Sequence, residues 1–157
     1  MARIGITGHR HIPGIALPEI RHRLEVELKD RADVALSSLA AGADQLFADR
    51  ALAVGIPLTA VVPAQDYVDH LDDSHAVTEY RRLLGLCRSV VQMPYDVCSP
   101  EAYEAAGRWI VEHCDRLLAV WDGEPARGRG GTAEIVAYAH QLDVPVQVLW
   151  LDGALRA

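Results

Sequence analysis

A glycine-rich segment in the last third of the chain carries residue types that bind phosphate groups. The sequence Gly128-Arg129-Gly130-Gly131-Thr132 stands at the expected start of a helix. Glycines leave backbone N–H groups accessible, and the first turn of a helix carries a partial positive charge. The segment therefore indicates an anion site, to which Arg129 adds a charge and Thr132 a hydroxyl. A flexible loop with Thr132 as an N-cap is the alternative.

The first apolar run of the chain ends in a second turn of this kind, Thr7-Gly8-His9-Arg10. Gly8 lets a ligand approach the backbone, and His9 and Arg10 offer hydrogen-bond donors to a phosphate or a ribose. The turn lacks the G-x-G-x-x-G spacing, and the next helix begins only near Pro18, which disfavours a dinucleotide site. A tight turn with solvated basic side chains is the alternative.

Two further strand ends carry candidate ligand-binding residues. Gly42 and Asp44 stand where a helix is expected to begin, and Asp44 can complement the helix dipole or accept a hydrogen bond from a ribose hydroxyl. Trp121 and Asp122 end the apolar run that precedes the glycine-rich segment. Aromatic side chains at such positions, Trp121 and Tyr67 among them, stack on a base or pack against the edge of the core.

The segment 66–75 holds four aspartates and two histidines, His70 and His75. These residue types bind metal ions, but no pair of them has the spacing of a zinc motif. We favour a solvated loop with helix-capping aspartates, and we predict neither a metal nor another cofactor. The roles of both histidines stay open.

Short β-rich apolar runs alternate with longer amphipathic stretches, which is typical of β-α units around a parallel sheet with both faces covered. The predicted strands are 3–7, 34–39, 58–62, 89–93, 117–121 and 146–151. The predicted helices begin near Pro18, Gly42, Asp73, Ser99 and Gly131. The pattern predicts one α/β, Rossmann-like, three-layer domain over residues 1–157, with a mostly parallel sheet of about six strands.

The expected elements also place the candidate residues. Ligands of open parallel sheets bind beyond the carboxyl ends of the strands. Because the turns above all follow predicted strands, the first turn and the late glycine-rich segment are expected to line one cleft. In the third helix we expect Val77, Tyr80, Leu84 and Cys87 to form the buried stripe.

Composition limits the classes of protein and partner. The chain has 157 residues, of which 50% are hydrophobic and 24% charged, as in a single globular domain. Its net charge of −7 disfavours nonspecific binding to duplex nucleic acid. No apolar run reaches the roughly 18 residues of a membrane span, and the N-terminus lacks a signal-peptide layout, so we expect a cytoplasmic protein. The three cysteines, Cys87, Cys98 and Cys114, indicate neither a disulfide framework nor a zinc knuckle.

The segments GITGHR (5–10), AAGAD (40–44) and GGTAE (130–134) together resemble the SLOG superfamily of Rossmann-like proteins. Its best-known branch is the LOG phosphoribohydrolases, once labelled lysine decarboxylases. The resemblance implies a site for a nucleotide or a nucleotide-derived ligand. Since this family commonly pairs through helices, it also implies a homodimer or a larger homo-oligomer, for which the apolar stripe from Tyr103 to Cys114 is the candidate surface.

Two residues are the catalytic candidates that the resemblance implies. LOG enzymes carry the motif Pro-Gly-Gly-x-Gly-Thr-x-x-Glu, whereas Glu134 follows Thr132 one residue early. The family's arginine falls at Ala106, so Arg108 is the nearest substitute, although its spacing from Glu104 also suits a solvated ion pair. The same segment resembles the Gly-Thr-x-x-Glu stretch of nucleoside 2-deoxyribosyltransferases, whose glutamate attacks the sugar carbon.

We therefore predict that the chain binds a nucleotide or a nucleotide-derived ligand at the strand-end cleft. The alternative is an N-glycosidic hydrolase or transferase acting on a nucleoside monophosphate. In that case Glu134 would stabilise the sugar cation, and Arg10 or Arg108 would orient the phosphate. The missing family arginine favours binding over catalysis.

Overall fold

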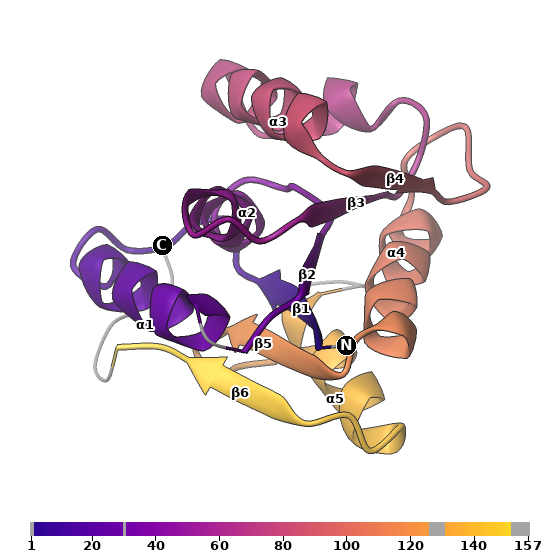
Figure 1. Ribbon diagram of the computed structural model, residues 1–157. Coiled ribbons are helices and arrows are strands. Elements are labelled where there is room, and N and C mark those ends of the chain that lie inside the picture. The colour runs from indigo at the N-terminus through magenta and orange to yellow at the C-terminus, as the bar shows by residue number, and fades with distance from the viewer. Residues whose placement is uncertain (1, 30, 126–130, 152–157) are drawn as a thin grey trace.

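A six-stranded parallel sheet forms the centre of the protein (Figure 1). The computed structural model describes residues 2–29, 31–125 and 131–151. The strands are β1 (Arg3–Gly8), β2 (Val34–Ser37), β3 (Leu58–Val62), β4 (Ser89–Gln92), β5 (Arg116–Val120) and β6 (Val146–Leu149). They lie in the order β4-β3-β2-β1-β5-β6, and every neighbouring pair is parallel. The predicted α/β, Rossmann-like fold is confirmed.

Five α-helices cover the two faces of the sheet, as Figure 1 shows. One face carries α1 (Leu17–Lys29), α2 (Ala43–Ala53) and α3 (Ser74–Leu86), and the other carries α4 (Pro100–His113) and α5 (Thr132–Gln141). A short 3-10 helix, η1 (Tyr67–His70), precedes α3. None of these helices is long and apolar enough to cross a bilayer, within the residues that the structure describes.

Alternate side chains of the strands build two separate cores. Ile6 and Leu118 pack with Phe47 of α2 on one face, whereas Leu117 packs with Ile110 of α4 on the other. Since both faces of the central strands are buried, most residues of these strands are apolar, which explains the runs in the sequence.

Two predicted helix starts are confirmed with their capping side chains. The Asp73 carboxylate accepts a hydrogen bond of 2.8 Å from the Ala76 amide at the start of α3. The Ser99 hydroxyl accepts one of 3.1 Å from the Ala102 amide, and Pro100 follows in the first turn of α4. Each cap satisfies an amide that has no partner inside the helix.

The buried stripe of α3 differs from the prediction by one position. Tyr80 is buried as expected, but Ala76 and Leu83 are buried where we predicted Val77 and Leu84. One residue corresponds to a rotation of about 100° around a helix. A polar contact accompanies this rotation: the buried Gln45 amide of α2 donates to the Ala76 carbonyl at 2.9 Å, which hydropathy does not reveal.

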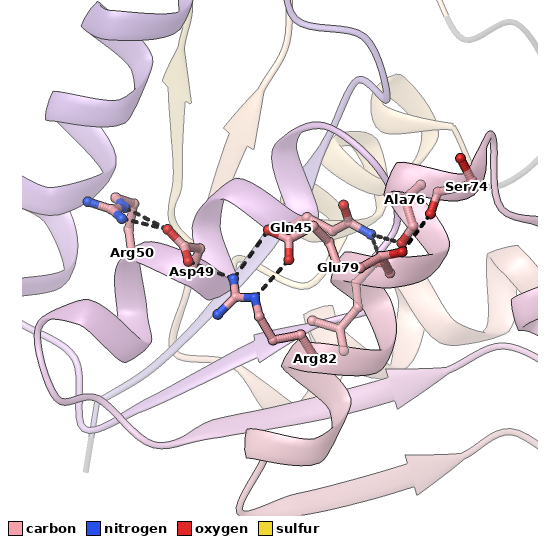
Figure 2. Close-up of polar contacts among 9 residues, drawn as sticks. Gln45, Asp49, Arg50, Ser74, Ala76, Glu79 and Arg82 are labelled. Atoms are coloured by element: carbon pink, nitrogen blue, oxygen red, sulfur yellow. Dashed lines mark hydrogen bonds and ion pairs between the residues drawn. The ribbon is translucent and has the colours of Figure 1, made fainter.

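Figure 2 shows the polar network that joins α2 to α3. Besides the Ala76 carbonyl, the Gln45 amide donates to the carbonyl of Leu39 at 3.1 Å. Further along the same helices, Arg82 pairs with Asp49 at 2.8 Å and with Glu79 at 2.7 Å. The network fixes α2 against both α3 and the loop that follows β2. Of these segments, α2 and the loop after β2 border the site described below.

The edge strand β4 contradicts the expectation that both faces of every strand are covered. Three of its four residues are exposed, and Val90 keeps 52% of its surface exposed. The reason is the path of α4, which runs from β4 back to β5 and packs over β1 and β3 instead. The apolar stripe on α4 lies inside the chain: Ala106, Ile110 and Cys114 are all buried against the sheet, so this stripe gives no surface for a dimer.

Candidate functional site

A cavity of about 360 Å³ opens at the carboxyl ends of β1, β2, β3 and β5. The chain leaves β1 toward β2 on one side and returns to β5 on the other, so the cavity lies where the strand order reverses. Open parallel sheets bind their ligands at this place. The volume falls in the range of small-molecule sites, about 300–1,000 Å³.

The first turn and the late glycine-rich segment meet at this cavity. Thr7, Gly8, His9 and Arg10 line it from the end of β1, and Gly131 and Thr132 line it from the start of α5. Two predicted residues of the glycine-rich segment, Arg129 and Gly130, lie outside the described residues.

His9 connects the turn after β1 with the turn after β5. Its Nε2 lies 3.2 Å from the Asp122 backbone nitrogen and 3.2 Å from Asp122 Oδ1. Both side chains keep only about a tenth of their surface exposed, and the His9 ring meets Trp150 edge-on at 5.3 Å. His9 and Asp122 therefore hold two walls of the cavity together, whereas the neighbouring Trp121 lines the cavity directly.

Gly8 and Gly42 allow the turn after β1 to pack tightly against α2. A Cβ at Gly8 would lie 2.5 Å from the Ala43 Cβ and 2.9 Å from the Val120 Cβ. Gly42 has a φ of +78°, and a Cβ there would lie 2.4 Å from the Arg10 carbonyl oxygen. We expected Gly8 to leave room for a ligand; in the structure its missing side chain leaves room for α2 and β5.

Asp44 lies in the first turn of α2 with its side chain in the cavity wall. Its Oδ2 accepts a hydrogen bond of 3.3 Å from the Ala40 amide. Burial raises the pKa of the Asp44 carboxyl to about 7, an effect that the Ala40 hydrogen bond only partly offsets. A carboxyl group with this pKa can accept or donate a hydrogen bond near neutral pH.

The N-terminus of α5 offers backbone donors to the cavity. The first amides of a helix have no acceptor within the helix, and they carry its partial positive charge. Thr132 is buried with 8% of its surface exposed, and Ala133 and Ile135 also line the cavity. The N-cap residue Gly131 has an ordinary φ of −70°, and no side chain caps this helix among the described residues.

Aromatic side chains form another wall of the cavity. Tyr67 of η1 is buried and meets Tyr80 edge-to-face at 5.5 Å and Tyr103 at 6.3 Å. Tyr103 lines the cavity from the first half of α4, although the sequence placed it in an apolar stripe of that helix. Because Ala106 and Ile110, which follow Tyr103 on the same helix face, are buried, hydropathy does not distinguish a cavity wall from the core.

The mouth of the cavity carries charges of both signs. Arg10 is 64% exposed and pairs with Asp72 at 3.3 Å, and His11 lies 3.6 Å from the same carboxylate. Asp72 belongs to the aspartate-rich segment, so this segment borders the site in addition to capping α3. The Arg10 guanidinium is thus already close to a counter-charge at the mouth.

The two catalytic candidates lie outside the lining of the cavity. Glu134 is exposed on α5, on a different side of the helix from Thr132 and Ile135. Arg108 pairs with Glu104 at 2.9 Å and lies over the Tyr138 ring at 4.5 Å. This is the ion-pair arrangement that its spacing from Glu104 suggested.

Gly107 and Ile135 set the distance between α4 and α5 beside the cavity. Both residues line it, and a Cβ at Gly107 would lie 2.5 Å from the Ile135 Cδ1. The absence of a side chain at this position lets the two helices approach each other closely.

The fold is shared with several solved structures. DNA processing protein A from Streptococcus pneumoniae superimposes with a TM-score of 0.71 at 17% identity, over 94% of this chain and 50% of that one. DNA processing protein A from Helicobacter pylori gives 0.68 at 14% identity, over 94% and 64%. The molybdenum cofactor binding protein from Rippkaea orientalis gives 0.62 at 16% identity, over 94% and 75%.

These similarities concern the fold alone, because the identities are low. The chain spans half of the Streptococcus pneumoniae protein and about two thirds of the Helicobacter pylori protein. The sequence matches no protein-family model and no curated protein sequence.

Proposed function

We propose that this protein binds a phosphate-bearing nucleotide, or a small ligand derived from one, in the cavity at the strand ends. The observation that carries the proposal is the meeting of the turn after β1 with the N-terminus of α5 across one cavity. The two segments lie more than a hundred residues apart in the chain, and both supply donors for an anion.

The walls of the cavity suit the three parts of a nucleotide. A phosphate fits the N-terminus of α5, where Thr132 adds its hydroxyl, and Arg10 lies at the mouth as a counter-charge. Asp44 suits the sugar, since its carboxyl group accepts hydrogen bonds from hydroxyls and would repel a phosphate when ionised. Tyr67 and Tyr103 provide apolar rings for the base.

The similar structures support a ligand site on this fold without choosing the ligand. The Helicobacter pylori protein binds single-stranded DNA, and the Rippkaea orientalis protein binds the molybdenum cofactor. A long polyanion is disfavoured for this chain because its net charge is −7 and Asp44 and Asp72 lie in the cavity wall. A single nucleotide needs only one anion subsite. The proposal agrees with membership of the SLOG superfamily, which we also propose.

Binding without cleavage is the function that we favour. An N-glycosidic hydrolase needs a carboxylate at the sugar carbon, and its candidate, Glu134, is exposed outside the lining of the cavity. Arg108, the candidate for orienting the phosphate, is held by Glu104 on the outer face of α4. We therefore expect no release of free base when the protein is incubated with nucleoside monophosphates.

A thermal-shift titration tests the proposal. The panel contains the common nucleoside 5′-monophosphates, the matching nucleosides and inorganic phosphate. We expect at least one monophosphate to raise the melting temperature more than its nucleoside does, because the phosphate adds the contact with α5. Chromatography of the same mixtures measures base release.

Gly131→Val places a side chain at the anion subsite without backbone strain, since the φ of Gly131 is −70°. We expect this variant to lose the shift. Gly14→Val is the matched control, because a Cβ at Gly14 meets nothing within 4 Å and the residue lies outside the cavity lining. If no monophosphate shifts the wild type, or if Gly131→Val responds as Gly14→Val does, the proposal is wrong. Base release that disappears in Glu134→Ala would support the hydrolase instead.

A further inference from the structure

Asp66, His70 and Cys98 bring three potential metal ligands together beside the cavity. Asp66 precedes η1, His70 ends it, and Cys98 lies in the loop between β4 and α4. The ligand atoms of all three side chains lie within 4.8 Å of one another, and the His70 Nε2 is 3.0 Å from the Asp66 Oδ2. Motif spacings do not reveal this cluster, because Cys98 comes from a different loop than Asp66 and His70.

From this cluster we infer a binding site for a zinc-like divalent transition-metal ion, held by Asp66, His70 and Cys98 at the rim of the cavity. The inference does not depend on the nucleotide proposal, because it needs only these three side chains and the loops that carry them.

The donor set favours zinc over magnesium or calcium. Imidazole nitrogen and thiolate sulfur are ligands for zinc and its transition-metal neighbours, whereas magnesium and calcium prefer oxygen alone. Zinc bonds of about 2.0–2.3 Å in a tetrahedral site place the ligand atoms roughly 3.3–3.8 Å apart. The three ligand atoms lie within 4.8 Å of one another, so modest movements of the side chains would bring them to this spacing.

The two loops are held together by the backbone, which preorganises the cluster. The Gln65 amide donates to the Tyr95 carbonyl at 3.0 Å, and the Asp66 amide donates to the Asp96 carbonyl at 3.3 Å. The Cys98 amide donates to Asp66 Oδ1 at 2.8 Å, which leaves Asp66 Oδ2 directed toward His70. A carboxylate held through one oxygen and ligating through the other is a common support of metal sites.

The charges of the ligand set also fit a divalent ion. A bound cation would favour the thiolate, and the thiol proton would then be released to solvent. Together with the Asp66 carboxylate, the thiolate would balance the two positive charges of the ion.

The fourth coordination position is the functional feature of this site. His70 and Tyr103 line the cavity, so an ion at the cluster would lie at its rim. Three protein ligands leave one position of a tetrahedral ion for a water molecule or an oxygen of a bound anion. The site would thus add a Lewis-acidic contact to the cavity.

Titration of the reduced, chelator-treated full chain with Co²⁺, in the absence of nucleotides, tests the inference. We expect saturation at one ion per chain and the near-ultraviolet absorption of a cobalt–thiolate bond. Competition with Zn²⁺ should remove this absorption, because zinc binds such sites more tightly than cobalt does.

Substitutions separate the site from adventitious binding. Cys98→Ser should abolish the cobalt–thiolate absorption, and His70→Ala should weaken binding at least about tenfold. His70 is 46% exposed, so its loss should leave the far-ultraviolet circular dichroism unchanged. Cys87→Ser and His75→Ala, which change residues outside the cluster, should bind cobalt as the wild type does. Absence of saturable binding, or thiolate absorption that survives in Cys98→Ser, would overturn the inference.

Discussion

The His9 imidazole lies 3.2 Å from both the backbone nitrogen and Oδ1 of Asp122, and through this contact it joins the turn after β1 to the turn after β5. The same two turns border the cavity at the reversal of strand order. His9 thus has a structural role at the site whether or not it touches a ligand.

Replacing His9 with alanine should destabilise the protein by about 1–3 kcal/mol, because the buried Asp122 groups lose a hydrogen-bonding partner. Urea unfolding monitored by tryptophan fluorescence measures this loss. His11→Ala is the control, since His11 is 66% exposed and lies 3.6 Å from Asp72. Equal stability of the two variants would show that the His9–Asp122 contact does not hold the turns.

Gly42→Ala should be strongly destabilising because two effects act together. The positive φ of Gly42 costs about 1 kcal/mol or more for a residue with a Cβ, and that Cβ would clash with the Arg10 and His9 carbonyl groups. We expect a loss of at least about 2 kcal/mol in the free energy of unfolding. Gly85→Ala is the matched control: it lies inside α3 with nothing within 4 Å of its Cβ, and it should be neutral or stabilising by roughly 0.5–1 kcal/mol.

Because of Asp44, the free energy of unfolding should fall as the pH rises from about 4 to about 7. The pKa of its carboxyl is about 7 in the folded protein, against 3.8 as the ordinary value. Between these values the folded chain binds the Asp44 proton more tightly than the unfolded chain does, so each rise in pH favours unfolding. The slope that Asp44 gives to the free energy of unfolding against pH is at most on the order of 1 kcal/mol per pH unit. This slope disappears above the pKa of the folded protein.

Asp44→Asn removes this dependence, because the amide does not ionise while its oxygen still accepts from Ala40. The measurement is the free energy of unfolding of both chains at about pH 5 and about pH 8. The wild type should lose more stability over this interval than the variant, and the other carboxylates cancel in the comparison. Parallel curves for the two chains would contradict the raised pKa of Asp44.

The fold could be predicted because its signals are local and strong. Each predicted strand and α-helix lies within a few residues of its expected position among the described residues, since buried parallel strands are mostly apolar and Ser99-Pro100 marks a helix start. Exposure of β4 could not be predicted, because it depends on the path of α4 across the sheet.

Only part of the site could be predicted from the sequence, for a similar reason. Turns at strand ends could be assigned to one edge, so it follows from topology that Gly8 and His9 line the same cavity as Gly131 and Thr132. The contribution of Tyr103, the Gln45 bond to α3 and the approach of Cys98 to His70 each require the tertiary arrangement. Nothing in the local pattern around these residues separates them from ordinary core or loop residues.

Because Gly107 and Ile135 pack closely together, a substitution at either position would change the shape of the cavity without changing its polar groups. A single methyl group at position 107 must displace the Ile135 side chain, which also lines the cavity. Such a change would resize the pocket while Asp44, Thr132 and Arg10 keep their places. The size of the cavity and the chemistry of its walls can therefore change independently, the first through the packing of α4 against α5 and the second through the turns at the strand ends.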